Sequence, residues 1–128
     1  MPVTLEMVQP RVMRLTITTP WTVKEMADVY VEEQKLFDVS QLTIYSIINV
    51  EDVHSIPPGV LRLRAAPMVV DPKSVQVLVV GANAFARAIT ETGFKLAHYR
   101  EVKFFASEDD VWKYLNPLLE ATQTTAQN

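Results

Sequence analysis

The sequence predicts a single α/β domain built on one mixed, mostly parallel sheet with helices packed on it. The first observation is the apolar run Val75–Val80, which ends at Gly81 and is followed at helical spacing by residues 82–93. Strands that are apolar on both faces occur mainly in parallel sheets covered by helices. The second observation is a strict apolar and polar alternation near the N-terminus, which is typical of half-buried strands. We therefore place Val75–Val80 near the centre of the sheet.

The alternating segments cover residues 3–7 and 12–18, with Gln9, Pro10 and Arg11 between them. A proline in a turn between two alternating segments is typical of an antiparallel hairpin, here added to the edge of the main sheet. This edge carries few charges that would block pairing with another strand. We therefore also expect a homodimer.

The next segment opens with Thr22 and Glu25, which have the spacing of a capping box, and it continues as a helix with one charged stripe. Glu33 falls inside the apolar arc of this helix. Because an unpaired buried carboxylate is costly, we expect Glu33 to reach the solvent at the rim. The alternative is an acid that faces a partner.

Further along, the pattern predicts a strand over 42–48, a polar turn over 49–55 and a short helix over 57–66 that Pro67 ends. The helix after the central strand should start at the N-cap Asn83, with Gly93 as the left-handed residue at its end.

The C-terminal part is predicted to hold a strand over 101–106 and a helix that is capped by residues 107–110 and kinks or ends near Asn116, because Pro117 removes one backbone hydrogen bond. Residues 121–128 are polar, and we expect a disordered tail there. The predicted organisation is one domain over 1–120 followed by this tail.

Composition excludes several classes of function. The chain has 128 residues, a formal charge of -3, 48% hydrophobic residues and no cysteine. Its acidic balance and scattered basic residues do not suit nucleic acid. The absence of cysteine removes thiol chemistry. No segment resembles a signal peptide or a membrane span, so we expect a cytoplasmic protein.

Enzyme chemistry is poorly supported by the motifs. Asp52, His54 and Ser55 include the residue types of a hydrolase triad but are packed into one turn, whereas a triad converges from separate parts of a fold. The carboxylates of residues 51, 52 and 108–110 are explained by a turn and by a first helical turn, and we assign no metal to them. The turn after Gly81 lacks the further glycines of a dinucleotide loop. We expect no cofactor.

The predicted elements follow the order strand, strand, helix, then alternating strand and helix. The chain also carries the segments Val50-Glu-Asp-Val53, Pro58-Gly-Val-Leu61, Val77-Leu-Val-Val-Gly81, Ala86–Gly93 and Val102–Trp112. Together these features resemble the STAS domain. The chain is most similar to the small bacterial branch related to anti-sigma-factor antagonists and grouped with CRAL-TRIO lipid-binding domains. The resemblance covers residues 3–119.

The resemblance implies an α/β regulatory domain that binds a partner protein. In anti-sigma-factor antagonists, a serine at the start of the helix after a central strand is phosphorylated by a kinase. The matching loop is His54–Gly59, where Ile56, Pro57 or Pro58 stands at the serine position. Only Ser55 offers a hydroxyl, displaced toward the strand, so the resemblance does not carry phosphorylation to this chain.

Two hypotheses of different classes follow. The first is a non-enzymatic STAS-like interaction or regulatory module whose docking face consists of Glu51, Asp52, His54, Ser55, Pro57, Pro58, Gly59, Asn83 and Arg87. The second is a small-molecule or lipid binder with an apolar cavity lined by Tyr30, Phe37, Phe85, Phe94 and Trp112. A weak hydrolase is a distant third.

Overall fold

The computed structural model describes residues 2–55, 57, 59 and 66–127. The elements of this part are β1 (Val3–Gln9), β2 (Val12–Thr18), α1 (Val23–Val39), β3 (Ile44–Asp52), α2 (Pro67–Val70), β4 (Ser74–Val80), α3 (Ala84–Leu96), β5 (Val102–Phe105) and α4 (Glu108–Gln127). Strands and helices follow one another in the predicted order.

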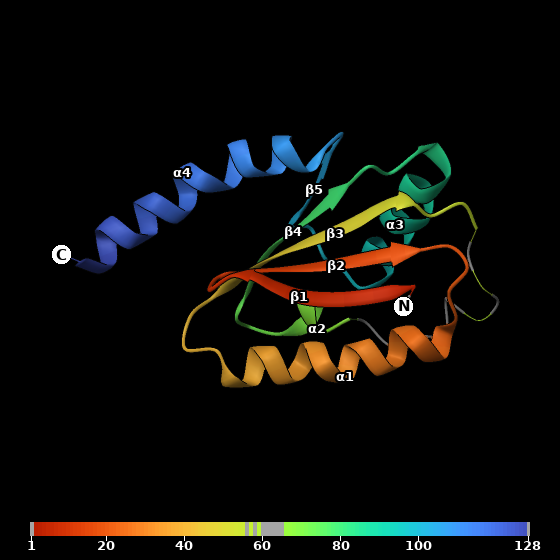
Figure 1. The fold of residues 1–128 in the computed structure, drawn as a ribbon, viewed down its shortest axis with the longest axis horizontal. Helices are drawn as coiled ribbons and strands as arrows, with labels where there is room; N and C mark the ends of the chain where they lie inside the picture. Colours follow the sequence, from red (N-terminus) through yellow and green to blue (C-terminus); the bar gives the residue numbers. More distant parts are fainter. Residues whose placement is uncertain (1, 56, 58, 60–65, 128) are drawn as a thin grey trace.

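The strands form one sheet in the order β1-β2-β3-β4-β5 (Figure 1). The pair β1 and β2 is antiparallel, whereas β2 to β5 run parallel. The predicted α/β class, the N-terminal hairpin and the mostly parallel sheet are therefore confirmed. The central position of Val75–Val80 is confirmed as well, because β4 lies between β3 and β5 and residues 77–80 have no exposed surface.

The sheet separates two apolar clusters. One face holds Met13, Ile44 and Val79, packed with buried side chains of α1, α2 and α3. The other face holds Ile47 and Leu78, packed with Val111 and Leu115 of α4. Figure 1 shows α4 on the side of the sheet away from α1.

The strand order explains this division. Each parallel connection steps to the next strand in the same direction, and right-handed crossovers then place their helices on the same face. The second face of the central strands is equally apolar and is left for the last helix. α4 contacts β4 and β5, which are the strands nearest to it along the chain.

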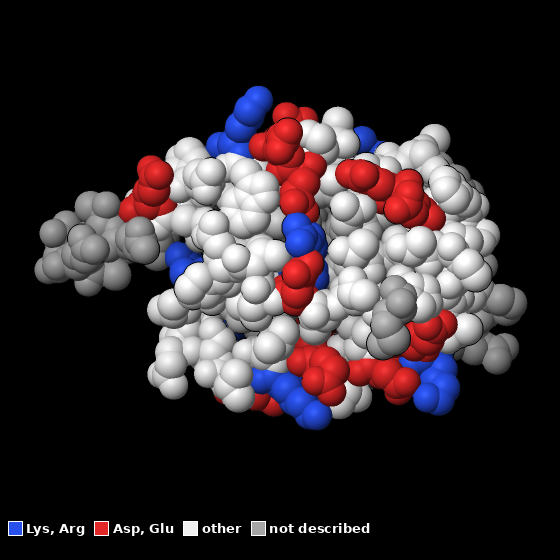
Figure 2. Space-filling view, in the orientation of Figure 1, with Lys and Arg blue, Asp and Glu red and all other residues white. Residues whose placement is uncertain are grey.

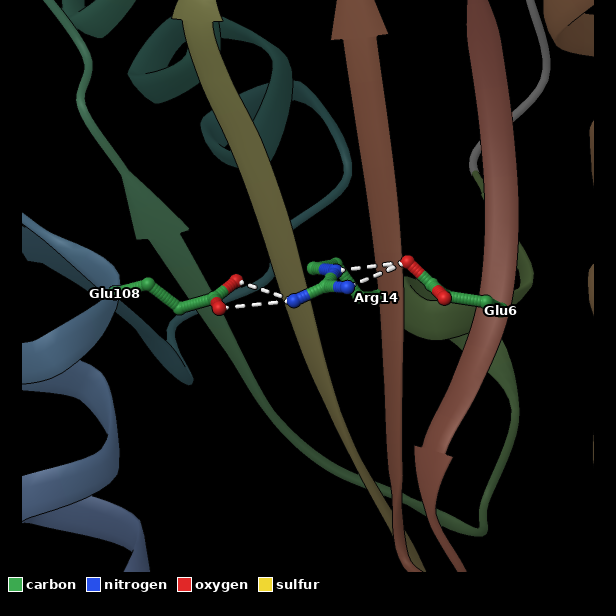
Figure 3. Close-up of polar contacts among 3 residues, drawn as sticks. All are labelled: Glu6, Arg14 and Glu108. Atoms are coloured by element: carbon green, nitrogen blue, oxygen red, sulfur yellow. Dashed lines mark hydrogen bonds and ion pairs between the residues drawn. The ribbon is translucent and has the colours of Figure 1, made fainter.

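An arginine on the second face ties α4 to the hairpin (Figure 3). Arg14 of β2 donates from Nη1 to both carboxylate oxygens of Glu108, at 3.0 and 2.8 Å, and from Nε and Nη2 to Oε1 of Glu6, at 3.0 and 2.6 Å. The bond to Glu6 is the largest contribution that raises the pKa of Arg14, partial burial opposes it, and Glu108 adds to the rise. Each carboxylate is held by two charge-assisted hydrogen bonds, which add geometric specificity to the charge attraction.

Two predicted boundaries in the middle of the chain are wrong. β3 extends to Asp52, because it follows β2 through the pairing of Thr18 with Asp52, so Glu51 and Asp52 are strand residues. Pro67 begins α2 instead of ending a helix, which suits a residue whose missing N–H is not needed in a first turn. The helix predicted over 57–66 lies mostly outside the described residues.

Two predicted helix ends also differ. α3 runs through Gly93 to Leu96, and the left-handed residue is His98, with φ 56°. α4 continues through Pro117 to Gln127, so it does not end near Asn116, and the predicted kink stays a prediction. Lys113 and Pro117 are both exposed, so solvent can satisfy the carbonyl that the proline leaves without a donor. The division into a domain over 1–120 and a separate tail stays a prediction.

Leu78 provides a test of the two-sided core. Leu78→Asp places a lone carboxylate between β4 and α4 in a site with no exposed surface, and we expect the domain to unfold. Thr92→Asp, at an exposed position of α3, is the control and should melt close to wild type. Circular dichroism melts of both variants check this. A cooperative melt of Leu78→Asp at the wild-type temperature would contradict the assignment.

Candidate functional site

The candidate docking residues lie at the carboxyl end of the parallel strands, where β3 ends at Asp52 and β4 gives way to Gly81. In open α/β sheets a ligand crevice opens where the strand order reverses. The strand order of this sheet has no reversal. The described part of the carboxyl edge therefore consists of loops and helix starts, without the diverging connections of a switch point.

Glu51, near the end of β3, packs against Gly81, which follows β4. A Cβ atom on Gly81 would lie 2.1 Å from Cγ of Glu51, and Gly81 has a φ of 76°. Both facts require glycine, because any side chain would collide with Glu51 and would strain the backbone. The stem of Glu51 thus lies across the turn that leads into α3.

The backbone of the following residues is held by Thr19. The N–H of Thr19 donates to the Asp52 carbonyl at 3.2 Å, and the N–H of His54 donates to Oγ1 of Thr19 at 2.9 Å. Val53, between them, is buried in the first cluster. The side chains of Asp52, His54 and Ser55 are exposed on this fixed backbone.

Asn83 and Arg87 make hydrogen bonds within α3 and its N-cap. Oδ1 of Asn83 accepts from the N–H of Ala86 at 2.8 Å, which confirms the predicted N-cap. Nε of Arg87 donates to Oε1 of Glu91 at 2.9 Å, which confirms the predicted surface pair. The Arg87 guanidinium also lies 4.5 Å from the ring centroid of Phe104, a cation–π contact between distant segments that no sequence pattern indicates.

Acyl-transfer chemistry needs hydrogen bonds that join the side chains of the triad residue types. Among the described residues, no hydrogen bond joins the side chains of Asp52, His54 and Ser55, and the one contact of His54 is made by its backbone. Nor does the described part of the chain hold a group of three or more acidic, histidine or cysteine side chains placed to bind a metal. Glu108, one of the acids considered, is engaged by Arg14.

The rest of the predicted docking loop is only partly described. Pro57 is half-buried and Gly59 is exposed, whereas Pro58 lies outside the described residues.

The candidate cavity residues are divided by the sheet. Phe37, Phe94 and the half-buried Tyr30 belong to the cluster under α1 to α3, whereas Trp112 packs in the cluster under α4. The side chain of Phe85 lies outside the described part. Trp112 therefore cannot line one cavity together with the other three.

Glu33 is the site that the sequence prediction placed wrongly. Its side chain has no exposed surface and does not reach the rim. Oε1 accepts the backbone N–H of Met68 at 2.6 Å, and Oε2 is buried without a hydrogen-bond partner among the residues that the structure describes. Burial raises the pKa of Glu33 to about 7, with the Met68 bond opposing the rise. Its position within the apolar arc of α1 was the signal for this burial.

No protein-family model, no curated protein and no solved structure matches this chain. None of the helices in the described part combines the length and the apolar character that a membrane crossing requires.

The raised pKa of Glu33 makes the stability of the fold depend on pH. With a folded pKa of about 7 and an ordinary value of 4.5, folded Glu33 keeps a proton that the unfolded chain has released between these pH values. Protonated Glu33 therefore contributes its full stabilisation below pH 4.5. As the pH rises through 7, the free energy of unfolding falls by about 3 kcal/mol. Urea unfolding at pH 5 and pH 8 measures the difference.

Glu33→Gln should remove most of this pH dependence, because a neutral amide can still accept from Met68 and does not ionise. Glu32→Gln is the matched control one residue away, where the native carboxylate is exposed and pairs with Lys35. It should keep the wild-type dependence. A Glu33→Gln protein whose stability still falls between pH 5 and pH 8 as in wild type would contradict the assignment.

Proposed function

We propose that this chain is a non-enzymatic interaction module of the STAS-like type, which docks a partner protein through the carboxyl edge of its sheet. One observation carries the proposal. Asp52 and His54 present exposed side chains on a backbone that Thr19 holds in place, with Ser55 exposed next to them, and no hydrogen bond among the described residues engages these side chains in a catalytic relay.

The chemistry of this edge suits protein recognition. Its side chains offer two carboxylates, an imidazole and a hydroxyl on a preorganised loop, and preorganisation lowers the entropic cost of binding. Figure 2 shows several separate groups of acidic side chains on the face in view, some with basic side chains beside them. Such a face suits a partner with basic groups better than a phosphate backbone.

The order of strands and helices supports the STAS-like part of the proposal, since the resemblance rests on that order and it recurs in the structure. A regulatory role in the cytoplasm belongs to the same proposal. The alternative, an apolar ligand site among the aromatic residues, is not favoured, because Trp112 lies across the sheet from Phe37 and Phe94.

Docking can be separated from catalysis by substitution at the edge. Asp52→Ala, His54→Ala and Ser55→Ala should each change the free energy of unfolding by no more than about 0.5 kcal/mol, because these side chains are exposed. A chain with all three changes should lose its partner. The measurement is quantitative affinity capture from the native host, with the wild-type and the triply substituted chains as baits.

The matched control is Glu32→Ala with Lys35→Ala, which removes an exposed ion pair of α1 away from the edge. A protein recovered with wild type and with this control, but not with the edge variant, supports docking. An esterase and phosphatase screen runs beside it. Turnover that disappears with His54→Ala or Ser55→Ala would replace the docking proposal with a hydrolase.

A further inference from the structure

The two edges of the sheet are built differently. β5 is an edge of four residues that carries Lys103, and short length and a lysine are both devices that discourage pairing with another strand. β1 is an edge of seven residues without lysine, arginine or proline. Glu6 is the one charged residue of β1, and Arg14 of the neighbouring strand binds it.

The register of the hairpin shows which backbone groups face outward. Thr18 donates its N–H to the Pro2 carbonyl at 2.7 Å. In an antiparallel pair, every second residue bonds to the partner strand, so Thr4 and Glu6 bond to β2 while Val3, Leu5 and Met7 direct their N–H and C=O groups away from it. Among the described residues, no other hydrogen bond engages the backbone of these three.

We propose that the outward edge of β1 pairs antiparallel with β1 of a second copy of this chain, in a register centred on Leu5. A twofold axis at Leu5 sets Leu5 opposite Leu5 of the other copy and Val3 opposite Met7. All outward backbone groups of residues 3, 5 and 7 are then paired. Met7, which is 39% exposed, gains an apolar neighbour.

Charge selects this register over its neighbours. Centring on Leu5 places Glu6 opposite Thr4 of the other copy. Centring one position later places Glu6 directly opposite Glu6, a like-charge pair that destabilises antiparallel strands. Centring one position earlier leaves Met7 without a described partner. The dimer is a continuous sheet with α1 of both copies on the same face.

The register predicts opposite effects for two substitutions at the exposed residue Thr4. Thr4→Glu sets two like-charge pairs against Glu6 and should raise the dimer dissociation constant about tenfold, whereas Thr4→Lys should lower it by a similar factor. Thr92→Glu and Thr92→Lys make the same chemical changes on the exposed side of α3 and should leave the constant unchanged. Sedimentation equilibrium of the full chain measures all five proteins.

Cysteine crosslinking reads the register directly, since the native chain contains no cysteine. Oxidised Leu5→Cys should form a covalent dimer, because directly opposed Cα atoms lie within disulfide reach. Met7→Cys should not, because its opposite residue is Val3. If Leu5→Cys fails to fold, an equimolar mixture of Thr4→Cys and Glu6→Cys should crosslink between the two chains.

A dimer whose constant follows Thr4 in the stated directions, with crosslinking at position 5, supports the proposal. A wild-type chain that stays at 14.5 kDa at high micromolar concentration overturns it. So does a dimer that ignores both Thr4 variants, or a monomer that captures an extended segment of another protein at β1.

Discussion

The need to cover both faces of β3 and β4 governs this structure. Ile47 and Leu78 face one side of the sheet, whereas Ile44 and Val79 face the other, and none of them retains exposed surface. Burial of such side chains contributes roughly 1.5–3 kcal/mol each. Because the strand order sends every crossover helix to the first face, the second face depends on α4. The ion pair between Arg14 and Glu108 holds the start of that helix against the hairpin.

The same one-sided order shapes the carboxyl edge of the sheet. The strand order has no reversal, and among the described residues local contacts join the carboxyl ends of β3 and β4. Glu51 lies against Gly81, Thr19 holds the backbone at His54, and Asn83 caps α3. Glu51 contributes its stem, and Thr19 and Asn83 contribute side-chain oxygens, while the side chains of Asp52, His54 and Ser55 stay exposed.

Glu33 shows how tertiary structure can reverse a sequence-based expectation. The cost of burying a carboxylate predicted a rim position. In the structure Met68 supplies a single backbone donor, and the raised pKa of Glu33 reduces the cost further by keeping the group partly protonated near neutrality. Neither compensation is visible in the sequence, because Met68 lies 35 positions away along the chain.

The sequence by itself determined the class of fold, the hairpin, the central strand and the caps at Thr22 and Asn83, because these depend on periodicity and on side chains within a few residues of each other. Tertiary structure decided the rest. β3 ends where its pairing with β2 ends. α4 continues through Pro117 on its exposed side. Trp112 lies on the face of the sheet that α4 covers. Each depends on contacts between distant segments, which local pattern does not encode.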